Sequence, residues 1–553
     1  MTNELRVRGR SAAPGFAQGP LFVIDDAPAT ADRRVGAPGE ELAALDAAIA
    51  AALEGLGRLV EGASGTPAEI LGFQLAILGD EELAAPAREA IAAGRPAHVA
   101  WREALDAEIA GYATSGDEAF AARAADLTDI RDRVLDAFAG AERRASIPPG
   151  TLVVAVDLPP SRFLAVDWGR GGAIALTGGS STSHVAMLAR SHGVPMLVGV
   201  DATLQDFARR ASQPALLDAE AGELIVAPSG SAREAFRRAA ASYARADEAS
   251  RERIREVART ADGTRIEVHL NVADPGELKA LDPAICDGIG LVRTEFLFER
   301  SGGLPDEDEQ LATYRRLVEW ADGRPVTIRT LDAGGDKPIP GLTIDGESHP
   351  FLGMRGLRLS LARPDVFRVQ LRALARAAAY ARDPGQLKVM LPMVTLPREL
   401  EAARTILEEE LRTLAAAGVR HARPRLGIMV EVPAAAIAAD DFAADFFSIG
   451  SNDLVQYVAA AGRDNGAVAD LADPVQPAMT RLIRGIVDVA RARGIDVSLC
   501  GDAGGDPRAL PALLQAGLRS VSVAPPRVAR AKAAIAAVRL PSPAANTDGR
   551  HGD

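Results

Sequence analysis

Cysteine and aromatic residues are scarce in this chain of 553 residues. Cysteine occurs twice, at Cys286 and Cys500, and aromatic residues make up 4% of the sequence. Two cysteines cannot build the disulfide framework of a secreted domain or a cysteine-rich metal cluster. We therefore expect a reducing compartment, the cytoplasm, and interpret Cys286 as a structural residue because it lies in an otherwise plain run.

Net positive charge, long apolar runs and nucleotide-binding loops are also missing. Lys and Arg number 62 against 75 Asp and Glu, and the net charge of −13 argues against nucleic acid or an anionic membrane as the partner. No apolar run is long enough to span a bilayer, and no signal peptide is recognisable. Neither a Gly-x-x-x-x-Gly-Lys-Ser/Thr loop nor a Gly-x-Gly-x-x-Gly fingerprint precedes a predicted helix, so nucleotide binding has no support.

Hydrophobic residues, at 48% of the chain, supply enough core for three or four domains. Between Glu40 and Phe138, apolar residues recur every three or four positions, which predicts about four amphipathic helices. Two short strands are expected in residues 5–24, before these helices, and four more after them. This order indicates a helical insertion in one α/β domain. The later strands are predicted at Leu152 to Val156, Ala173 to Leu176, Pro195 to Val200 and Glu223 to Val226.

The second half of the chain begins with a polar connector. Ser231 to Arg259 is rich in Arg, Glu and Ala, which is typical of a helix that crosses solvent between domains. From Ile266 onward, strands and helices alternate as in a parallel α/β domain, and eight strands predict a (β/α)8 barrel. They are Ile266 to Leu270, Gly288 to Val292, Val326 to Ile328, Lys388 to Pro392, Leu426 to Val430, Phe446 to Ile449, Val497 to Leu499 and Ser520 to Val523.

Polar residues with functional chemistry follow five of these strands directly. Since the carboxyl ends of barrel strands meet at the face where barrel active sites lie, we expect these side chains to converge on one mouth. An ordinary loop contact would explain one such residue, but their joint occurrence favours a site. They are Arg293, Arg329, Glu431, Asn452 with Asp453, and Cys500.

The stretch Thr177 to Val200 contains a second candidate site. A short apolar strand, a glycine turn and a helix follow one another, and His184 falls in the first turn of the helix. Backbone N–H groups and the hydroxyls of residues 180–183 surround this histidine at a helix N-terminus, where anionic oxygens are favoured. That setting suits a phosphorylated imidazole. A helix-capping histidine in an ordinary α/β unit is the alternative.

The motif GGSSTSHVAMLARSHGVP, which contains His184, resembles the phosphohistidine segment of the phosphoenolpyruvate-utilising enzymes. Within that group the chain is similar, from about Gly15 to about Ala531, to the Enzyme I family. These are the phosphoenolpyruvate-protein phosphotransferases of the bacterial sugar phosphotransferase system. The matching barrel motifs are GLVRTEF, IRTLDAGGDK, FLGMR, GIMVEVPA, SIGSNDLVQY, the turn at residues 462–465 and LCGDAGGD.

The resemblance implies a role for each candidate residue. His184 is the phosphohistidine nucleophile, and Cys500 is the general acid that protonates the enolate to give pyruvate. Carboxylates are the hard ligands that Mg²⁺ prefers, so Glu431 and Asp453 are the expected metal ligands. Guanidinium forks pair with phosphate oxygens. Phosphoenolpyruvate is expected to bind Arg293, Arg329, Arg355, Lys337, Asn452 and Arg463.

The resemblance also implies a reaction and a domain order. The phosphoryl group is expected to pass from phosphoenolpyruvate to His184, and then to a histidine of an HPr-like phosphocarrier protein, as the first step of a phosphotransferase system. A cytoplasmic homodimer that associates through the barrel is also implied. The expected domains are a swivelling β/α phosphohistidine domain (1–38 and 142–228), an inserted helical carrier-binding subdomain (39–141), a linker helix (229–260), a TIM barrel that binds phosphoenolpyruvate (261–540) and a disordered tail (541–553).

Three positions depart from the family pattern. Phe163 stands where the family has a threonine that orients the histidine, Thr128 replaces an arginine near the phosphoryl group, and Asp502 replaces a glutamate that supports Cys500. Arg123 matches another arginine of that group, although an arginine at the edge of an apolar helix stripe is equally consistent with the pattern. These departures leave open a regulatory protein without turnover.

A pyruvate dikinase or phosphoenolpyruvate synthase that uses ATP is a further alternative. Such an enzyme needs an ATP-binding domain, and the chain begins too close to the expected phosphohistidine domain to contain one.

Residues 71–78, Leu-Gly-Phe-Gln-Leu-Ala-Ile-Leu, carry apolar side chains on more than one helix face. We expect some of them to stay exposed and, by the resemblance, to contact the carrier. Phe73 and Gln74 are the predicted docking residues. Because Gln74 replaces a histidine common in the family, the carrier should differ in detail from the best-known one.

Overall fold

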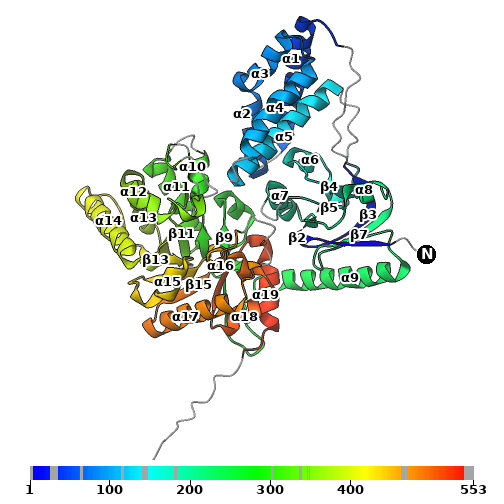
Figure 1. The fold of residues 1–553 in the computed structure, drawn as a ribbon. Helices are drawn as coiled ribbons and strands as arrows, with labels where there is room; N and C mark the ends of the chain where they lie inside the picture. The colour runs from blue at the N-terminus through cyan, green and yellow to red at the C-terminus, as the bar shows by residue number, and fades with distance from the viewer. Residues whose placement is uncertain are drawn as a thin grey trace, which may run out of the picture. The chain divides into compact units, whose positions relative to one another are not determined.

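Two compact units make up the structure, residues 1–245 and 246–553 (Figure 1). Lys337, Arg463 and the predicted tail lie outside the residues that the computed structural model describes. The described residues are 4–24, 35–62, 66–113, 118–139, 147–179, 183–300, 304–334, 339, 341–344, 347, 349–462, 468 and 471–540.

An eight-stranded sheet forms the α/β part of the first unit, in the order β1-β8-β7-β3-β4-β5-β6-β2. Strands β3 to β6 are parallel, and the remaining pairs are antiparallel. The sequence predicted one strand fewer on each side of the helices, because a short break divides β1 from β2 and a proline opens β7. The strands are β1 (Leu5–Arg8), β2 (Arg10–Ala13), β3 (Phe16–Val23), β4 (Leu152–Ala155), β5 (Ala173–Leu176), β6 (Met196–Val198), β7 (Pro214–Asp218) and β8 (Glu223–Val226).

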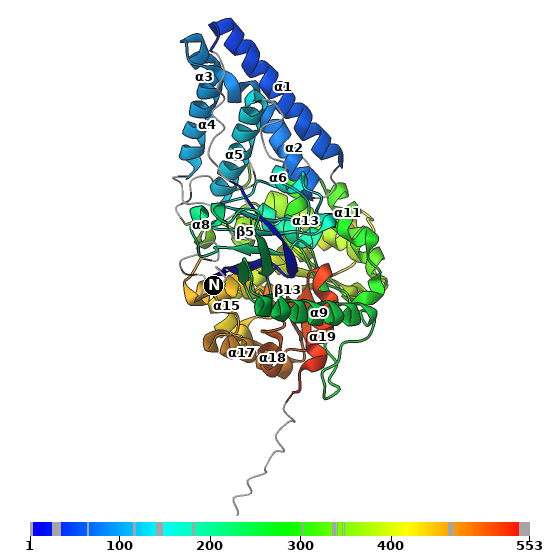
Figure 2. The ribbon, with the colours of Figure 1, turned by 90° about the vertical axis from the view of Figure 1, so that its right-hand side faces the viewer.

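Five helices of the described residues form an elongated bundle beside this sheet (Figure 2). The sequence predicted about four, since the apolar period runs on through the short break at Gly79 and Asp80. The Asp80 side chain caps the third helix by accepting a hydrogen bond from the Glu82 N–H at 3.0 Å. The helices are α1 (Pro38–Gly62), α2 (Thr66–Leu78), α3 (Glu81–Ala92), α4 (Ala97–Ala113) and α5 (Glu118–Ala139).

A buried polar network joins the bundle to α6 (Pro160–Leu164) of the α/β part. Gln74 is fully buried, and its Nε2 donates to Asp126 Oδ1 at 2.9 Å and to Asp129 Oδ2 at 3.2 Å. The Ser161 hydroxyl donates to Asp129 Oδ1 at 2.6 Å. The prediction of Gln74 as an exposed docking residue is therefore wrong. Its two partners lie 52 and 55 residues further along the chain, so local sequence could not reveal them.

The substitution Gln74→Leu is expected to lower the free energy of unfolding by about 1–3 kcal/mol, because it removes two hydrogen bonds to the buried carboxylates of Asp126 and Asp129. Urea denaturation measures the change. Gln205→Leu, at an exposed position, is the matched control and should stay within about 0.5 kcal/mol of the parent. An unchanged midpoint for Gln74→Leu would mean that Gln74 contributes nothing to this network.

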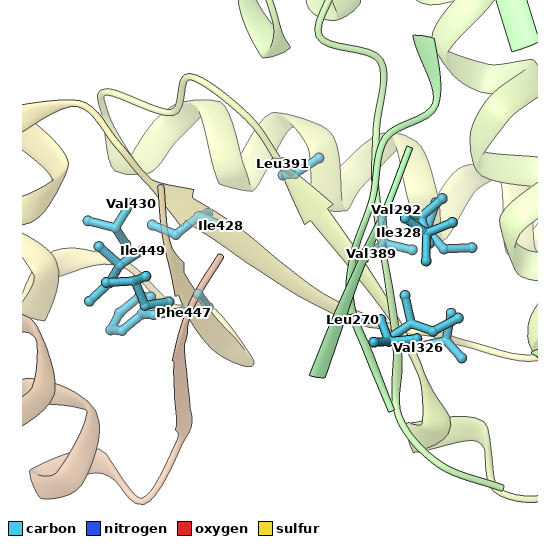
Figure 3. Close-up of a cluster of buried hydrophobic side chains, with 14 of the residues drawn as sticks. Leu270, Val292, Val326, Ile328, Val389, Leu391, Ile428, Val430, Phe447 and Ile449 are labelled. Carbon is cyan, nitrogen blue, oxygen red and sulfur yellow. The ribbon is translucent and has the colours of Figure 1, made fainter. Parts of the chain in front are cut away.

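A closed parallel barrel forms the second unit, as the sequence predicted. Its strands run in the order β9 to β16, and β16 pairs with β9 to close the barrel. Figure 3 shows apolar side chains of these strands packed together in the core. The strands are β9 (Glu267–Val272), β10 (Ile289–Val292), β11 (Val326–Arg329), β12 (Leu387–Leu391), β13 (Arg425–Val430), β14 (Phe446–Ile449), β15 (Asp496–Leu499) and β16 (Ser520–Val523).

Helices follow these strands, and among the described residues none is long and apolar enough to cross a membrane. Pro364, Pro397 and Pro477 each open a helix, where a missing N–H costs nothing. The helices are α10 (Glu295–Arg300), α11 (Glu307–Ala321), α12 (Leu357–Ala362), α13 (Pro364–Ala378), α14 (Pro397–Ala416), α15 (Pro433–Ile437), α16 (Ser451–Ala459), α17 (Pro477–Arg493), α18 (Leu510–Gln515) and α19 (Val528–Ala537).

Candidate active site

The alternation of residues along the barrel strands places four of the predicted side chains at the mouth of the barrel. The last apolar residue of each strand belongs to the large core of the second unit, and successive strand residues point to opposite faces. The residue that follows therefore faces the barrel interior. Leu291, Met390, Met429, Phe446 and Cys500 form a separate cluster consistent with this register. In sequence, Arg293 follows Val292, Arg329 follows Ile328, Glu431 follows Val430 and Cys500 follows Leu499.

Two buried arginines share one carboxylate at the mouth. Arg329 Nη1 lies 2.9 Å from Asp332 Oδ2, and Arg355 donates to the same carboxylate through Nη2 at 2.9 Å and Nε at 3.2 Å. Arg329 Nη2 also donates to Glu295 Oε1 at 3.0 Å. Although burial disfavours the charges, the neighbouring carboxylates raise the pKa of both guanidinium groups. Both arginines are therefore charged and held in place, which suits them to bind phosphate.

A glycine allows the two motifs that carry these arginines to pack closely. Gly334 has a φ of +99°, and a Cβ there would lie 2.6 Å from the Met354 carbonyl oxygen and 2.8 Å from Arg355 Cβ. Any larger residue would force the two loops apart. The motif IRTLDAGGDK therefore needs this glycine to bring Asp332 to Arg355.

Glu431 and Asp453 are both buried at the mouth. Glu431 Oε1 accepts a hydrogen bond from the Met393 N–H at 2.7 Å, whereas its buried Oε2 accepts none from the described residues. Asp453 Oδ1 lies 3.5 Å from Arg355 Nη1. Burial, with the neighbouring carboxylates of Asp453 and Asp332, raises the pKa of Glu431 to about 8. Glu431 Oε2 and the Asp453 carboxylate are two hard oxygen donors of the kind that divalent cations prefer, and among the described residues no group of three or more such side chains could hold a metal ion.

The raised pKa of Glu431 predicts a pH dependence of stability. A carboxyl group whose pKa is higher in the folded chain destabilises the fold as the pH rises from about 4.5 through about 8. The metal-free protein should therefore lose thermal stability over this window relative to Glu431→Gln, whose amide does not ionise. Melting curves in chelator at a series of pH values measure the difference. Two parallel curves would contradict the raised pKa.

Cys500 is buried directly after β15. Its N–H donates to the Ile449 carbonyl oxygen at 3.0 Å, and its Sγ lies 3.6 Å from the same oxygen. Burial, with the nearby Glu431 carboxylate, raises the pKa of the Cys500 thiol to about 11. The thiol therefore keeps its proton at neutral pH, which suits a proton donor rather than a nucleophile.

Asn452 forms two hydrogen bonds with Asp502, one of the three residues that depart from the family pattern. Its Nδ2 donates to Asp502 Oδ2 at 3.1 Å, and the Asp502 N–H donates to Asn452 Oδ1 at 3.0 Å. Asp502 thus orients Asn452 at the mouth. Arg293 is exposed there, and its backbone N–H donates to the Val272 carbonyl oxygen at 3.1 Å.

The predicted phosphohistidine segment has the backbone that the sequence indicated. Helix α7 (His184–His192) follows β5 and begins at His184, with Ser183 as its N-cap. The Ser183 hydroxyl accepts a hydrogen bond from the Ala186 N–H at 3.3 Å, and Gly193, at φ +66°, ends the helix. The His184 side chain and residues 180–182 lie outside the described part of the chain.

Phe163, in the position of the family's threonine, is fully buried beneath α7. Its ring stacks on Trp168 with centroids 5.2 Å apart and meets the edge of His192 at 5.3 Å. Phe163 thus anchors the end of the helix that begins with His184. Thr128 is partly buried on α5, and the Arg123 side chain is outside the described residues.

Sequence reasoning overlooked four residues at the mouth. Asp332 and Glu295 stand inside motifs that were recognised for their arginines, so their presence was visible but their ion pairs were not. The Tyr457 hydroxyl donates to the Phe351 carbonyl oxygen at 2.6 Å, and Met393 contacts Glu431 through its backbone. A backbone donor leaves no signal in a side-chain pattern.

Three family models match the chain in order. They are the N-terminal part of the PEP-utilising enzymes at residues 8–123, their mobile domain at 147–222 and their PEP-binding domain at 247–540. The third model, which alone covers more than half of the chain, spans the barrel and the arginines and carboxylates at its mouth. The fold, the site and these matches place the protein in the class of PEP-utilising enzymes.

Curated relatives narrow this class. The phosphoenolpyruvate-protein phosphotransferase of Haloferax volcanii is 42% identical over 85% of this chain and 82% of its own length. That of Geobacillus stearothermophilus is 36% identical over 96% and 93%. A multiphosphoryl transfer protein of Rhodobacter capsulatus is 40% identical over 83% of this chain and 54% of its own. The chain belongs to the phosphoenolpyruvate-protein phosphotransferase family, which confirms the resemblance seen in the sequence.

Proposed function

We propose that the protein transfers the phosphoryl group of phosphoenolpyruvate to its own His184, and from there to a histidine of an HPr-like phosphocarrier protein, with release of pyruvate. The observation that carries this proposal is the pair of charged, buried arginines, Arg329 and Arg355, that share Asp332 beside the protonated thiol of Cys500. The names of the relatives support it.

The guanidinium groups proposed to bind the substrate's phosphate are already held in position in the structure. Arg329 and Arg355 are fixed by carboxylates before any ligand arrives, so binding costs little side-chain entropy. The proposed contacts to the phosphate and carboxylate of phosphoenolpyruvate come from Arg293, Arg329, Arg355, Lys337, Asn452 and Arg463.

Glu431 and Asp453 are the residues that would hold Mg²⁺. The fit rests on Glu431 Oε2, a buried oxygen with no hydrogen-bond donor among the described residues, and on the carboxylates that surround it. When bound, the ion offsets the negative charge of the phosphate and carboxylate.

The chain's own residues account for the two chemical events. An imidazole nitrogen of His184 bonds to phosphorus as the bond between phosphorus and the enolate oxygen breaks. Arg329 and Arg355 stabilise the charge that spreads over the phosphoryl oxygens in a loose transition state. The methylene carbon of the enolate then takes the proton of Cys500 Sγ to give pyruvate, and the thiolate regains a proton from water.

The carrier is proposed to dock on the first unit near α7. Helices α2 and α7 both contact α6. Exposed apolar side chains of this unit lie on α2, on the loop after β4 and on α7, and they are Phe73, Val156 and Met187. Large apolar side chains in contact with solvent favour a protein partner.

Truncation of Phe73 to alanine should lower kcat/KM for the carrier by about tenfold and leave labelling by phosphoenolpyruvate unchanged. Phe73 is 44% exposed, so its loss removes contact area without opening the core. Rapid-quench measurement of both steps separates them. Ile437→Ala, at an exposed apolar side chain of the barrel unit, is the control and should change neither step. Equal loss in both steps would contradict the docking role of Phe73.

We further propose a cytoplasmic homodimer that associates through the barrel. Its support is the family and the exposed apolar side chains of the second unit, among them Leu352 and Leu471. Light scattering of the intact protein tests the dimer. A monomer at micromolar concentration would contradict it.

Incubation with ³²P-labelled phosphoenolpyruvate and Mg²⁺ tests the proposed function. We expect label on the parent protein, none on His184→Ala, and transfer of the label to an added phosphocarrier. A protein without turnover would stay unlabelled, and an ATP-linked dikinase or synthase would take label from γ- or β-labelled ATP. Either result would overturn the proposal.

A further inference from the structure

Met393 has a left-handed backbone that no helix end or glycine explains. Its φ is +57°, and it lies in the loop between β12 and α14, at the barrel mouth. Left-handed residues other than glycine are uncommon, and bulky ones carry strain. Asp322 and Ala460, which share this conformation, end α11 and α16, where it is ordinary. Met393 ends no helix.

The strained conformation gives Met393 one specific contact. Its N–H donates to Glu431 Oε1 at 2.7 Å, while Glu431 Oε2 accepts no hydrogen bond from the described residues. Gly450 closes the other side, because a Cβ there would lie 2.9 Å from Oε2. The carboxylate is thus tethered through Oε1, while the buried Oε2 keeps its hydrogen-bonding capacity unused by the described residues.

Neighbouring segments hold Met393 in this conformation. A Cβ at Gly356 would lie 2.9 Å from Met393 Cβ and Cγ, so the two loops pack closely. The Leu357 N–H donates to the Pro392 carbonyl oxygen at 3.2 Å, and Thr395 Oγ1 donates to the Met393 carbonyl oxygen at 3.4 Å. Strain that the surroundings impose at a functional loop indicates a role for the strained group.

We infer that Met393 is a positioning residue whose left-handed backbone N–H fixes Glu431 Oε1 and thereby presents Oε2 to the divalent cation. The inference rests on the proposed function, which makes Glu431 a metal ligand. Groups that orient a metal ligand commonly contribute 10- to 100-fold to metal affinity.

Substitutions at Met393 separate the backbone role from side-chain packing. Met393→Val keeps an apolar side chain but disfavours positive φ, because a β-branched residue is a genuine outlier there. Met393→Gly loses the side chain but keeps both the conformation and the N–H. If Met393 acts through side-chain packing, Met393→Gly should lose more Mn²⁺ affinity than Met393→Val. If it acts through its backbone, Met393→Val should lose more. Asp322→Val, at an exposed left-handed position that ends α11, is the matched control.

The measurement is Mn²⁺ binding to the full-length protein without phosphoenolpyruvate, followed by electron paramagnetic resonance, with melting temperatures in chelator. We expect the Mn²⁺ dissociation constant to rise at least about tenfold in Met393→Val and to stay within about threefold of the parent in Met393→Gly and Asp322→Val. Met393→Gly should nevertheless melt at a lower temperature than the parent, because its side chain is buried.

If Met393→Val does not fold, Met393→Ala replaces it, since alanine and glycine lose nearly the same side chain and differ in tolerance of positive φ. Weaker Mn²⁺ binding by alanine than by glycine supports the inference. Equal binding by the two, or binding by Met393→Val as tight as that of the parent, overturns it while the metal site stands. Absence of Mn²⁺ binding by the parent overturns the proposed metal site, and the inference with it.

Discussion

Replacing Glu431 with glutamine is expected to reduce the rate of His184 labelling by phosphoenolpyruvate about 1,000-fold or more. The change removes one of two anionic oxygen ligands proposed for Mg²⁺, and a bound metal typically supplies several kcal/mol of charge stabilisation in the transition state. The amide keeps nearly the shape of the carboxylate and its acceptor for the Met393 N–H. The fold should therefore survive, and rapid-quench labelling at saturating phosphoenolpyruvate and limiting Mg²⁺ measures the loss.

The control for this experiment is Glu410→Gln. Glu410 is another buried carboxylate of the barrel unit, but it lies on α14 and pairs with Arg368 and Arg372. Its neutralisation tests whether loss of any buried carboxylate slows labelling. We expect the Glu410 variant to label at close to the parent rate. Full-rate labelling of Glu431→Gln at limiting Mg²⁺ would refute the assignment of Glu431 as a metal ligand.

Most of the barrel site was visible in the sequence because it depends on short-range features. A buried parallel strand is an apolar run, and the polar residue that ends it must lie at the carboxyl-end face. Glu431 and Cys500 were both located in this way, and the strand register of the structure confirms their positions. The eight strands were recognisable for the same reason.

Features that depend on partners distant in sequence were not visible. Gln74 is buried because two carboxylates of another helix surround its amide, and nothing in residues 71–78 encodes that. The ion pairs of Asp332 with Arg329 and Arg355 depend on how two loops pack. The left-handed conformation of Met393 is imposed by its neighbours against its own preference. Such contacts follow from the assembled fold rather than from local pattern.

Division of the chain between Arg245 and Ala246 is expected to leave two fragments with complementary activities. The boundary between the two compact units falls there in the sequence, within helix α9 (Gly230–Glu252). The first part of this helix packs on the first unit, where the Phe236 and Tyr243 rings lie 5.5 Å and 5.2 Å from Phe16. The fragment 1–245 therefore keeps the aromatic contacts that fix the helix.

The fragment 246–553 keeps the segment that follows the helix. Ile254 packs against the core of the barrel unit, and Lys532 Nζ on α19 donates to the carbonyl oxygens of Ile254 at 2.6 Å and Glu256 at 2.8 Å. A cut at the predicted end of the linker, after residue 260, would remove these contacts from the barrel. Division at residue 245 preserves them, so both fragments are expected to fold.

The expected result is a complete separation of the two transfers. The fragment 1–245, which carries His184, should accept label from a phosphorylated carrier but none from phosphoenolpyruvate. The fragment 246–553 should bind phosphoenolpyruvate, as calorimetry would show, and should take no label from either donor, because it lacks the nucleophile. Circular dichroism checks that each fragment is folded before its labelling is scored. Label on a folded fragment 246–553 would mean that His184 is not the sole acceptor, since the barrel would then have to supply a nucleophile of its own.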